Sequence, residues 1–439
     1  MERERVLSKD VHQHIGKTVH IQGWLHKKRM LGGLTFINVR DRSGLVQVVV
    51  EDKKEVEKLR GLQIGTVLKI VGKAVKEERA PGGAELHQPE ITVLVPVTDE
   101  PPIEIDKPIQ HKSENLDTLF DNRVIGLRNI QEAAVFKIQA SIVHVARNYF
   151  KENDFTEIRT PKLLAEPTEG GAEVFQMDYF GKTATLAQSP QFYKQIMVGV
   201  FERVYEIAPV YRAEPSATTR HMTEYVSIDG EMGFIGLQEL EDFLSGLLNA
   251  IVDGVWEKHK PELKKWNSTP PLLPKEIPSM TMAEIHEKYS KATSENSIGE
   301  KDLRPDEERW ICEYAKKNLG SEAVFVTEWP ADDMKFYHKA NAKNPKVADR
   351  IDLLFRGTEI VTASMRENDY GVVIKQLKNL AKGNPDDPGF APILTAMKYG
   401  MPTHGGFGMG LERVTQKIIG FANIKEATLF PRDINRLAP

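Results

Sequence analysis

The residues best suited to chemistry lie in the stretch 203–232, where arginines stand close to acidic and imidazole side chains. Arg212 and Glu214 follow a run of β-forming residues, and Arg220 and His221 precede a second run. A strand, a loop of small and polar residues and a returning strand would place these charges at one end of a hairpin. Because arginine is planar and always charged, the pattern predicts a phosphate site. A surface hairpin with solvated charges fits this stretch equally well.

A pair of carboxylates lies in the stretch 347–366, which is predicted to form two strands joined by a turn at Arg356 and Gly357. Such a hairpin would bring Asp352 and Glu359 to one site. Paired carboxylates beside arginines favour Mg²⁺ that is held together with phosphate oxygens. Two solvated surface acids are the alternative.

Two further stretches carry candidate ligand-binding groups. The stretch 401–420 runs from glycines into a helix whose first turn carries Arg413. Glycines let a backbone approach a ligand closely, although a glycine-rich turn with a surface arginine fits as well. Another helix is predicted to start at Pro190, and it would carry Gln191 and Lys194 on one face.

The composition is that of an ordinary soluble globular protein. The chain has 439 residues, and this length predicts two or three domains. Its net charge is −4. Its single cysteine, Cys312, excludes a disulfide within the chain and a cysteine-rich zinc site. The sequence has no apolar run of membrane-spanning length, and its charged N-terminus is unlike a signal peptide. Cytoplasm is therefore the expected location, with no membrane partner.

The elements that must position these residues begin with a small β domain. Residues 15–97 contain five β-forming runs separated by turn signals, with a helix candidate between the third and fourth runs. An OB-fold barrel has this arrangement and often binds single-stranded nucleic acid, although other small barrels have a similar number of strands. Arg29, Phe36 and Gln47 are the candidates for base contacts. Core packing is the alternative role for Phe36.

The rest of the chain is predicted to be a larger α+β domain. A charged, proline-containing stretch separates it from the barrel, and the expected organisation is a barrel at 1–100, a linker at 101–130 and a catalytic domain at 131–439 with a variable insertion around 265–345. Apolar residues at three- and four-residue steps predict helices at 130–153, 237–258 and 305–318. No chemistry is predicted for 270–345.

Three motifs, in order along the chain, resemble those of the class II aminoacyl-tRNA synthetases. FTEIRTPKL at 155–163 resembles motif 1, VYRAE with the downstream RHMTEYVSIDGEM resembles motif 2, and GMGLERV resembles motif 3. QSPQFYKQ at 188–195, TEGGAEVF at 168–175 and the ending FPRD-NRL are similar to the archaeal-type aspartyl branch of this class. The resemblance covers nearly the whole chain and is weakest at 270–345.

This resemblance implies both a fold and a reaction. The fold would be α+β, with an OB-fold barrel for the anticodon and a catalytic domain whose antiparallel sheet is flanked by helices, in a homodimer formed through motif 1. L-aspartate would attack ATP, with Mg²⁺ present, to give aspartyl-adenylate and pyrophosphate. The aspartyl group would then pass to the end of tRNA. Such a reaction depends more on several cations that stabilise the negative charge of the transition state than on general acid–base catalysis.

The resemblance also implies roles for individual residues. The principal catalytic groups would be Arg212, Glu359 and Arg413. Aspartate would be bound by Glu169, Gln191, Lys194, Arg212, Thr362 and Arg366. ATP would be bound by Arg212, Glu214, Arg220, His221, Met222, Glu359, Gly410, Leu411, Glu412 and Arg413. Mg²⁺ would be surrounded by Asp352, Glu359 and Thr362. The anticodon would be contacted by His26, Arg29, Phe36, Gln47 and Pro81.

Two features bear on specificity. The family usually has Ser-Gly-Gly-Gln-Arg where this chain has TASMR at 362–366, and the added bulk at Ala363 and Ser364 is expected to affect the choice between aspartate and a close analogue. His26 and Pro81 match relaxed enzymes, which charge both tRNA(Asp) and tRNA(Asn), because a proline cannot donate a hydrogen bond to the third anticodon base. Incidental loop residues are the alternative.

The leading hypothesis is an aspartyl-tRNA ligase that charges tRNA(Asp) and tRNA(Asn), with a tRNA-dependent amidotransferase to convert the Asp-tRNA(Asn). A ligase restricted to tRNA(Asp) is the nearest alternative. A tRNA-independent relative that makes an amide from the adenylate is a second, and the predicted barrel argues against it. A non-catalytic tRNA-binding regulator is a third, and the retained Arg212 and Arg413 argue against it.

Overall fold

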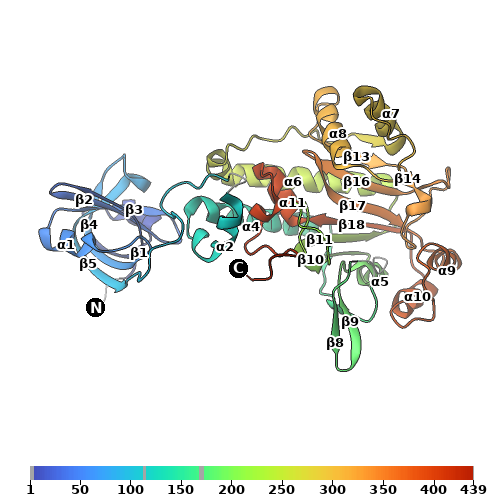
Figure 1. The fold of residues 1–439 in the computed structure, drawn as a ribbon, viewed down its shortest axis with the longest axis horizontal. Helices are drawn as coiled ribbons and strands as arrows, with labels where there is room; N and C mark the ends of the chain where they lie inside the picture. The colour runs from blue at the N-terminus through green and yellow to red at the C-terminus, as the bar shows by residue number, and fades with distance from the viewer. Residues whose placement is uncertain (1–3, 112–114, 168–172, 439) are drawn as a thin grey trace. The chain divides into compact units, whose positions relative to one another are not determined.

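The chain folds as two compact units, residues 1–133 and 134–439 (Figure 1). The structure is a computed structural model that describes residues 4–111, 115–167 and 173–438. No described helix is long and apolar enough to cross a membrane.

The first unit contains a closed five-stranded barrel in the order β1-β2-β3-β5-β4. Its strands are β1 (Thr18–Leu31), β2 (Leu34–Arg40), β3 (Leu45–Val50), β4 (Val67–Lys76) and β5 (Ala84–Val95). Helix α1 (Lys53–Arg60) lies between β3 and β4, as the sequence predicts. Alternate residues such as Ile37, Val39 and Val48 fill the barrel, while the residues between them face outward. The prediction of an OB-fold barrel is confirmed.

Two short helices, α2 (Leu116–Asp121) and α3 (Arg123–Gly126), lie in the stretch predicted to be a linker. Arg123 and Glu132 are fully buried there, and their side chains form an ion pair at 3.0 Å. His111 contacts the other oxygen of Glu132 at 2.6 Å. These contacts give the end of the first unit an ordered polar core.

The second unit is built on an eight-stranded sheet in the order β12-β13-β16-β17-β18-β11-β10-β6. The strands are β12 (Ser279–Thr281), β13 (Ala323–Thr327), β16 (Arg350–Phe355), β17 (Thr358–Arg366), β18 (His404–Gly410), β11 (Glu224–Gly233), β10 (Arg203–Tyr211) and β6 (Thr156–Glu157). The central strands are antiparallel, as the resemblance implies, but β12 and β6 pair in parallel with their neighbours at the two edges. The sheet is therefore mixed.

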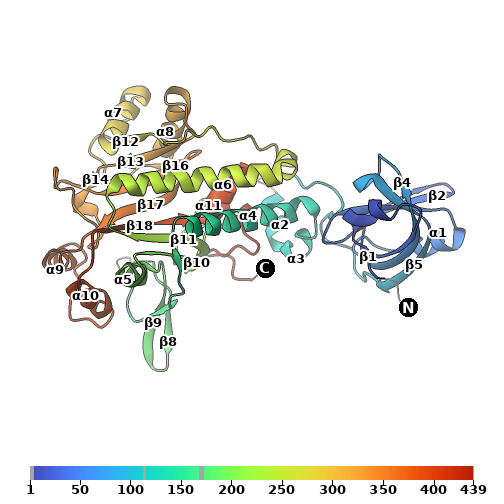
Figure 2. The ribbon, with the colours of Figure 1, turned by 180° about the vertical axis from the view of Figure 1, so that it is seen from behind.

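Long helices cover one face of this sheet. Figure 2 shows α4 (Ile130–Glu152) and α6 (Leu237–Lys265) running across it. Buried apolar residues of α4, α6 and α11 (Leu411–Ile419) pack against inward-facing residues of the central strands and form the main core of this unit. Helix α6 continues beyond the predicted end, with non-helical backbone at His259, two residues before Pro261.

The opposite side of the sheet carries the smaller elements. Helices α5 (Gln191–Phe201), α9 (Tyr370–Asn379) and α10 (Ala391–Lys398) form a second apolar cluster, and α7 (Met282–Thr293) and α8 (Pro305–Asn318) form a third with β12 and β13. The motif 1 stretch contains two short strands, β6 before Pro161 and β7 (Leu163–Leu164) after it. Strand β7 pairs with the hairpin of β8 (Gln176–Tyr179) and β9 (Lys182–Leu186). Strands β14 (Trp329–Pro330) and β15 (Val347–Ala348) pair separately.

Candidate active site

Strands β11 and β17 present polar residues, with glycines of β18 between them, on the face of the sheet that α4 and α6 leave uncovered. In one row across the sheet, Asp229 of β11 lies opposite Gly408 of β18, which lies opposite Thr362 of β17. In the next row, Glu231 lies opposite Gly406, which lies opposite Ser364. Strand alternation sends the residues between these rows into the core. The sequence therefore folds into a sheet with one apolar face and one polar face.

A cavity of about 610 Å³ opens over this polar face. The structure brings into its wall most of the residues that the resemblance assigns to aspartate and ATP. They are Gln191, Lys194, Arg212, Glu214, Arg220, His221, Met222, Glu359, Thr362, Arg366, Gly410, Glu412 and Arg413. Glu169 lies outside the described residues. The side chain of Leu411 packs in the hydrophobic core instead.

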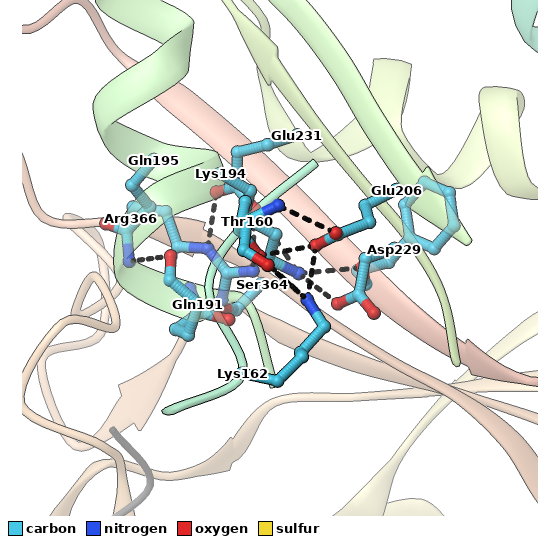
Figure 3. A network of polar contacts seen from close by, with 11 residues as sticks. Thr160, Lys162, Gln191, Lys194, Gln195, Glu206, Asp229, Glu231, Ser364 and Arg366 are labelled. Atoms are coloured by element: carbon cyan, nitrogen blue, oxygen red, sulfur yellow. Dashed lines mark hydrogen bonds and ion pairs between the residues drawn. The ribbon is translucent and has the colours of Figure 1, made fainter. Parts of the chain in front are cut away.

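One end of the cavity holds a compact cluster of buried charges (Figure 3). The Lys194 ammonium donates to Oδ1 of Asp229 at 2.9 Å and to the backbone oxygen of Phe407 at 2.8 Å. Arg366 donates through Nε and Nη2 to the two oxygens of Glu231, at 2.7 and 3.2 Å. Lys194 also lies 3.6 Å from Glu231, so two cations and two carboxylates alternate.

Glu231 is ionised in this cluster. Burial acts to raise the pKa of its carboxyl group, but the cations of Arg366 and Lys194 outweigh burial and lower it. The carboxylate lies over Gly406, where a Cβ atom would be 1.8 Å from Oε2 of Glu231. The absence of a side chain at Gly406 therefore makes room for Glu231, whereas the sequence had suggested room for a ligand.

Gln191 supplies a buried polar group with an open position. Only 4% of the residue is exposed, yet its Nε2 has no hydrogen-bond partner in the described part of the chain. It lies on the first turn of α5, three residues before Lys194, and both line the cavity. A buried donor without a partner is costly, so an acceptor on a bound ligand would satisfy it.

The loop between β10 and β11 forms another part of the wall, as the hairpin pattern predicts. β10 ends at Tyr211 opposite Glu224, and Arg212, Glu214, Arg220 and His221 lie in the loop between them. His221 accepts or donates a hydrogen bond at Nδ1 with Thr218 Oγ1, 2.9 Å away. Burial lowers the pKa of His221, so its imidazole is neutral at pH 7.

Arg413 and Glu359 meet at the same part of the cavity. Arg413 Nη1 donates to the backbone oxygen of Glu359 at 2.8 Å and to its Oε1 at 3.1 Å. Burial acts to raise the pKa of Glu359, but nearby arginines, first of all Arg413, outweigh burial and lower it. Glu359 is therefore ionised, and 33% of its side chain is exposed.

Asp352 is paired with Arg350 in the structure, whereas the sequence predicts that Asp352 and Glu359 form a pair of metal ligands. Both oxygens of Asp352 accept from Arg350, at 3.2 and 2.6 Å, and only 1% of the residue is exposed. Burial and the nearby Glu359 raise the pKa of Asp352 to about 7, although Arg350 opposes them. No cluster of three or more His, Cys, Asp or Glu side chains in the described part could hold a metal ion. Glu359, with Thr362 beside it, fits a Mg²⁺ ion that arrives with phosphate oxygens and keeps its waters.

The stretch 362–366 also differs from the expectation. Ala363 and Met365 point into the core beneath the sheet, so Ala363 adds no bulk beside a ligand. Thr362 and Arg366 line the cavity, and Ser364 lies between them on the same face. The hydroxyl of Ser364 is bonded to Arg366 Nη1.

In the barrel, the candidate base contacts gather on the outer face of β1, β2 and β3. Phe36 is half-buried on the side away from the barrel core, with Arg29 opposite it on β1, so it is not a core residue. Gln47 donates to Glu85 at 2.7 Å. Pro81 begins the short turn between β4 and β5.

His26 lies within strand β1, at an irregularity in its pairing with β2, and only 9% of it is exposed. It is therefore a strand residue, not the loop residue that the sequence suggested. Burial, followed by the nearby Arg40, lowers the pKa of its imidazole.

Several residues in the cavity wall or next to it were not predicted from the sequence. Asp229 and Glu231 lie in the second strand of motif 2, and no role was predicted for either of them from the sequence. His338 follows an irregular stretch, and its Nδ1 is buried without a partner in the described part. Glu308 comes from the region for which no chemistry was predicted, and it pairs with Arg220. The alternation of Ser227, Asp229 and Glu231 is the one sequence signal that points to a polar strand face.

The two units thus define a class of protein: an enzyme with a nucleic-acid-binding barrel and a cationic cavity on an open sheet face. The family described as tRNA synthetases class II (D, K and N) matches residues 115–434, and the OB-fold nucleic acid binding domain matches residues 19–94.

Full-length relatives agree with these matches. The chain is 42% identical to an aspartate–tRNA(Asp/Asn) ligase of Thermus thermophilus, over 99% of this chain and 100% of that one. It is 39% identical to an aspartate–tRNA(Asp/Asn) ligase of Deinococcus radiodurans, over 99% of each chain. It superposes on the crystal structure of an asparaginyl-tRNA synthetase from Pyrococcus horikoshii in complex with asparaginyl-adenylate, with a TM-score of 0.91, 28% identity and coverage of 99% and 100%. The chain belongs to the class II tRNA synthetases of the D, K and N group. It is an aminoacyl-tRNA ligase that uses ATP, an amino acid and tRNA.

Proposed function

We propose that the protein activates L-aspartate with ATP and transfers it to tRNA(Asp) and tRNA(Asn). The observation that carries this proposal is the buried cluster of Lys194, Asp229, Glu231 and Arg366 at one end of the cavity. Two cations with fixed positions suit a substrate with a carboxylate side chain, because charge-assisted hydrogen bonds to a carboxylate are strong and directional. The names of the full-length relatives support the same assignment.

The remaining cavity residues fit ATP. Arg212 would bind the α-phosphate and the reacting carboxylate, where negative charge develops as the new bond forms. Arg220 and His221 would bind the distal phosphates, Arg413 would hold the bent triphosphate, and Glu214 and Met222 would contact the base. Mg²⁺ would be held by Glu359 with the phosphates and would neutralise part of their charge. Asp352, whose carboxylate is paired with Arg350 in the structure, and Thr362 are the other proposed members of this metal site.

Asparagine is the second candidate amino acid, because the superposed Pyrococcus horikoshii structure is an asparaginyl-tRNA synthetase. The buried Lys194 favours aspartate, since an uncharged amide gains less from an ammonium group than a carboxylate does.

ATP–pyrophosphate exchange with aspartate and with asparagine tests the activation step. Exchange that depends on aspartate is expected, and Arg212→Ala should abolish it. Exchange with asparagine alone would reject the proposal. Charging of separate tRNA(Asp) and tRNA(Asn) transcripts then tests the second step, and charging of tRNA(Asp) alone would reject the relaxed specificity.

Two assignments accompany the proposal. A homodimer through residues 155–163 follows from the motif 1 resemblance, and light scattering on the purified protein measures it. An Asp-tRNA(Asn) product would require an amidotransferase that converts it to Asn-tRNA(Asn). Domain limits at 1–100, 101–130 and 131–439 stay a prediction.

A further inference from the structure

The guanidinium of Arg366 is held on two separate edges (Figure 3). Nε and Nη2 donate to Glu231, and Nη1 donates to the hydroxyl of Ser364 on the same strand. The ring of Tyr337 lies under the guanidinium, 5.5 Å from Cζ to the ring centroid. The contacts with Glu231 and Ser364 together engage all three nitrogens of this planar group, so they restrain its orientation more than the contacts with Glu231 alone.

The side chain of Ser364 contacts Arg366 and is shielded from the cavity. The residue is fully buried, 0% exposed, and it does not line the cavity, although Thr362 and Arg366 on either side of it do. Its backbone is paired with Gly406 on one side and with Arg350 on the other, so its position is set by the middle of the sheet. The hydroxyl is thus a rigid point from which Arg366 is oriented.

We propose that Ser364 is a positioning residue that sets the preference for an aspartate side chain over an asparagine side chain. This inference rests on the proposed function, in which Arg366 pairs with the side-chain carboxylate of the substrate. A carboxylate offers two acceptor oxygens to a planar guanidinium, whereas an amide offers one acceptor and one NH₂ donor. A guanidinium fixed in one plane therefore holds the amide donor against its own N–H groups.

Loss of the hydroxyl relieves this conflict. Without the Ser364 hydroxyl the guanidinium is held by Glu231 alone, and small shifts of this contact let Nη1 point a single N–H toward an amide oxygen. Binding of aspartate weakens because the guanidinium must be ordered during binding. Binding of asparagine weakens less, because the same freedom relieves the repulsion between the amide NH₂ group and the N–H groups of Arg366. Specificity of this kind depends on a repulsive contact as much as on an attractive one.

The test compares Ser364→Ala and Ser364→Gly with the wild type and with Ser321→Ala in full-length protein. Ser321 is also a fully buried serine of the second unit, and its hydroxyl donates to the backbone oxygen of Ala323 at 2.6 Å, away from the cavity wall. ATP–pyrophosphate exchange gives the KM for aspartate, the KM for ATP and the ratio of kcat/KM for aspartate to that for asparagine. Thermal melting of each variant reports its folding.

Both Ser364 variants are expected to raise the KM for aspartate and to lower the aspartate-to-asparagine ratio by about tenfold, the effect of one hydrogen bond to a charged group. The KM for ATP should stay within about twofold, and Ser321→Ala should leave the ratio unchanged. An unchanged aspartate-to-asparagine ratio in well-folded Ser364→Ala would overturn the inference. Equal rises in the KM for aspartate and the KM for ATP would also overturn it. If Ser364→Gly is unstable, Ser364→Ala alone decides. Absence of aspartate-dependent exchange in the wild type would instead overturn the proposed function itself.

Discussion

Glu308 on helix α8 and Arg220 in the loop between β10 and β11 form an ion pair, although they lie 88 positions apart in the sequence. The same oxygen of Glu308 also accepts from the backbone N–H of Glu359 at 3.1 Å. One carboxylate therefore ties together two residues proposed to bind the distal phosphates and their metal ion. Helix α8 belongs to the stretch 270–345, so this stretch supports the nucleotide end of the cavity.

Glu308→Ala should raise the KM for ATP by about three- to tenfold, because a hydrogen bond between charged groups contributes about 1.5 kcal/mol and this pair is partly exposed. The KM for aspartate should change by less than about twofold, since Glu308 holds groups of the nucleotide end only. Steady-state exchange kinetics measure both values. Glu313→Ala, an exposed acid on the same helix, is the matched control and should match the wild type. A lower KM for ATP in Glu308→Ala would show that Glu308 competes with ATP for Arg220.

Gly406→Ala should lower thermal stability and aspartate activation together. The new methyl group would lie 1.8 Å from Glu231 Oε2 and 2.4 Å from the backbone oxygen of Gly230, so the carboxylate must leave Arg366 or the strands must separate. Overpacking of this kind costs about 1–3 kcal/mol of the free energy of unfolding.

Differential scanning fluorimetry compares Gly406→Ala with Gly410→Ala, where the nearest atom to the new methyl group is 3.6 Å away. The second variant should melt close to the wild type. Equal melting temperatures for the two variants would contradict the role of Gly406 as the space occupied by Glu231.

Glu412→Gln should stabilise the protein increasingly as the pH rises. Burial raises the pKa of Glu412 to about 8, and its carboxyl group accepts from the backbone N–H of Val226. The unfolded chain releases this proton near the usual pKa of about 4.3, whereas the folded chain keeps it up to about pH 8. The stability that this group contributes is therefore fully present below about pH 4 and is lost as the pH rises toward 8.

Glutamine keeps an acceptor for Val226 and does not titrate. The difference in melting temperature between Glu412→Gln and the wild type should accordingly be small at pH 5 and larger at pH 8. Glu313→Gln, on the exposed side of α8, serves as the control and should follow the wild type at each pH. A constant difference between pH 5 and pH 8 would mean that Glu412 is ionised throughout.

Phe36→Ala should spare ATP–pyrophosphate exchange and weaken tRNA charging. Phe36 lies on the outer face of β2, so a base could stack on its ring, and stacking on an aromatic side chain contributes about 1–3 kcal/mol per base. Aminoacylation at limiting tRNA concentration measures the loss. Leu94→Ala provides a matched change, because Leu94 is an exposed apolar residue of strand β5. Unchanged charging by Phe36→Ala would remove it from the anticodon contacts.

The sequence predicted much of the local structure correctly. Helix α8 spans the predicted residues 305–318, and apolar and outward-facing residues alternate along the barrel strands. The motif 2 hairpin and its charged loop were predicted because β-forming runs and turn residues are local signals. Motif residues such as Arg212 and Arg413 could be assigned to one cavity only through the family resemblance.

The sequence by itself thus determined the elements, the OB-fold barrel and the family. The tertiary structure alone decided the partners of each charge. Asp352 pairs with Arg350, Gly406 makes room for Glu231, and Ser364 bonds to Arg366 while Ala363 points into the core. These contacts depend on the register between strands that are distant in the sequence. A shift of one residue would send each side chain to the other face of the sheet, and no local pattern specifies that register.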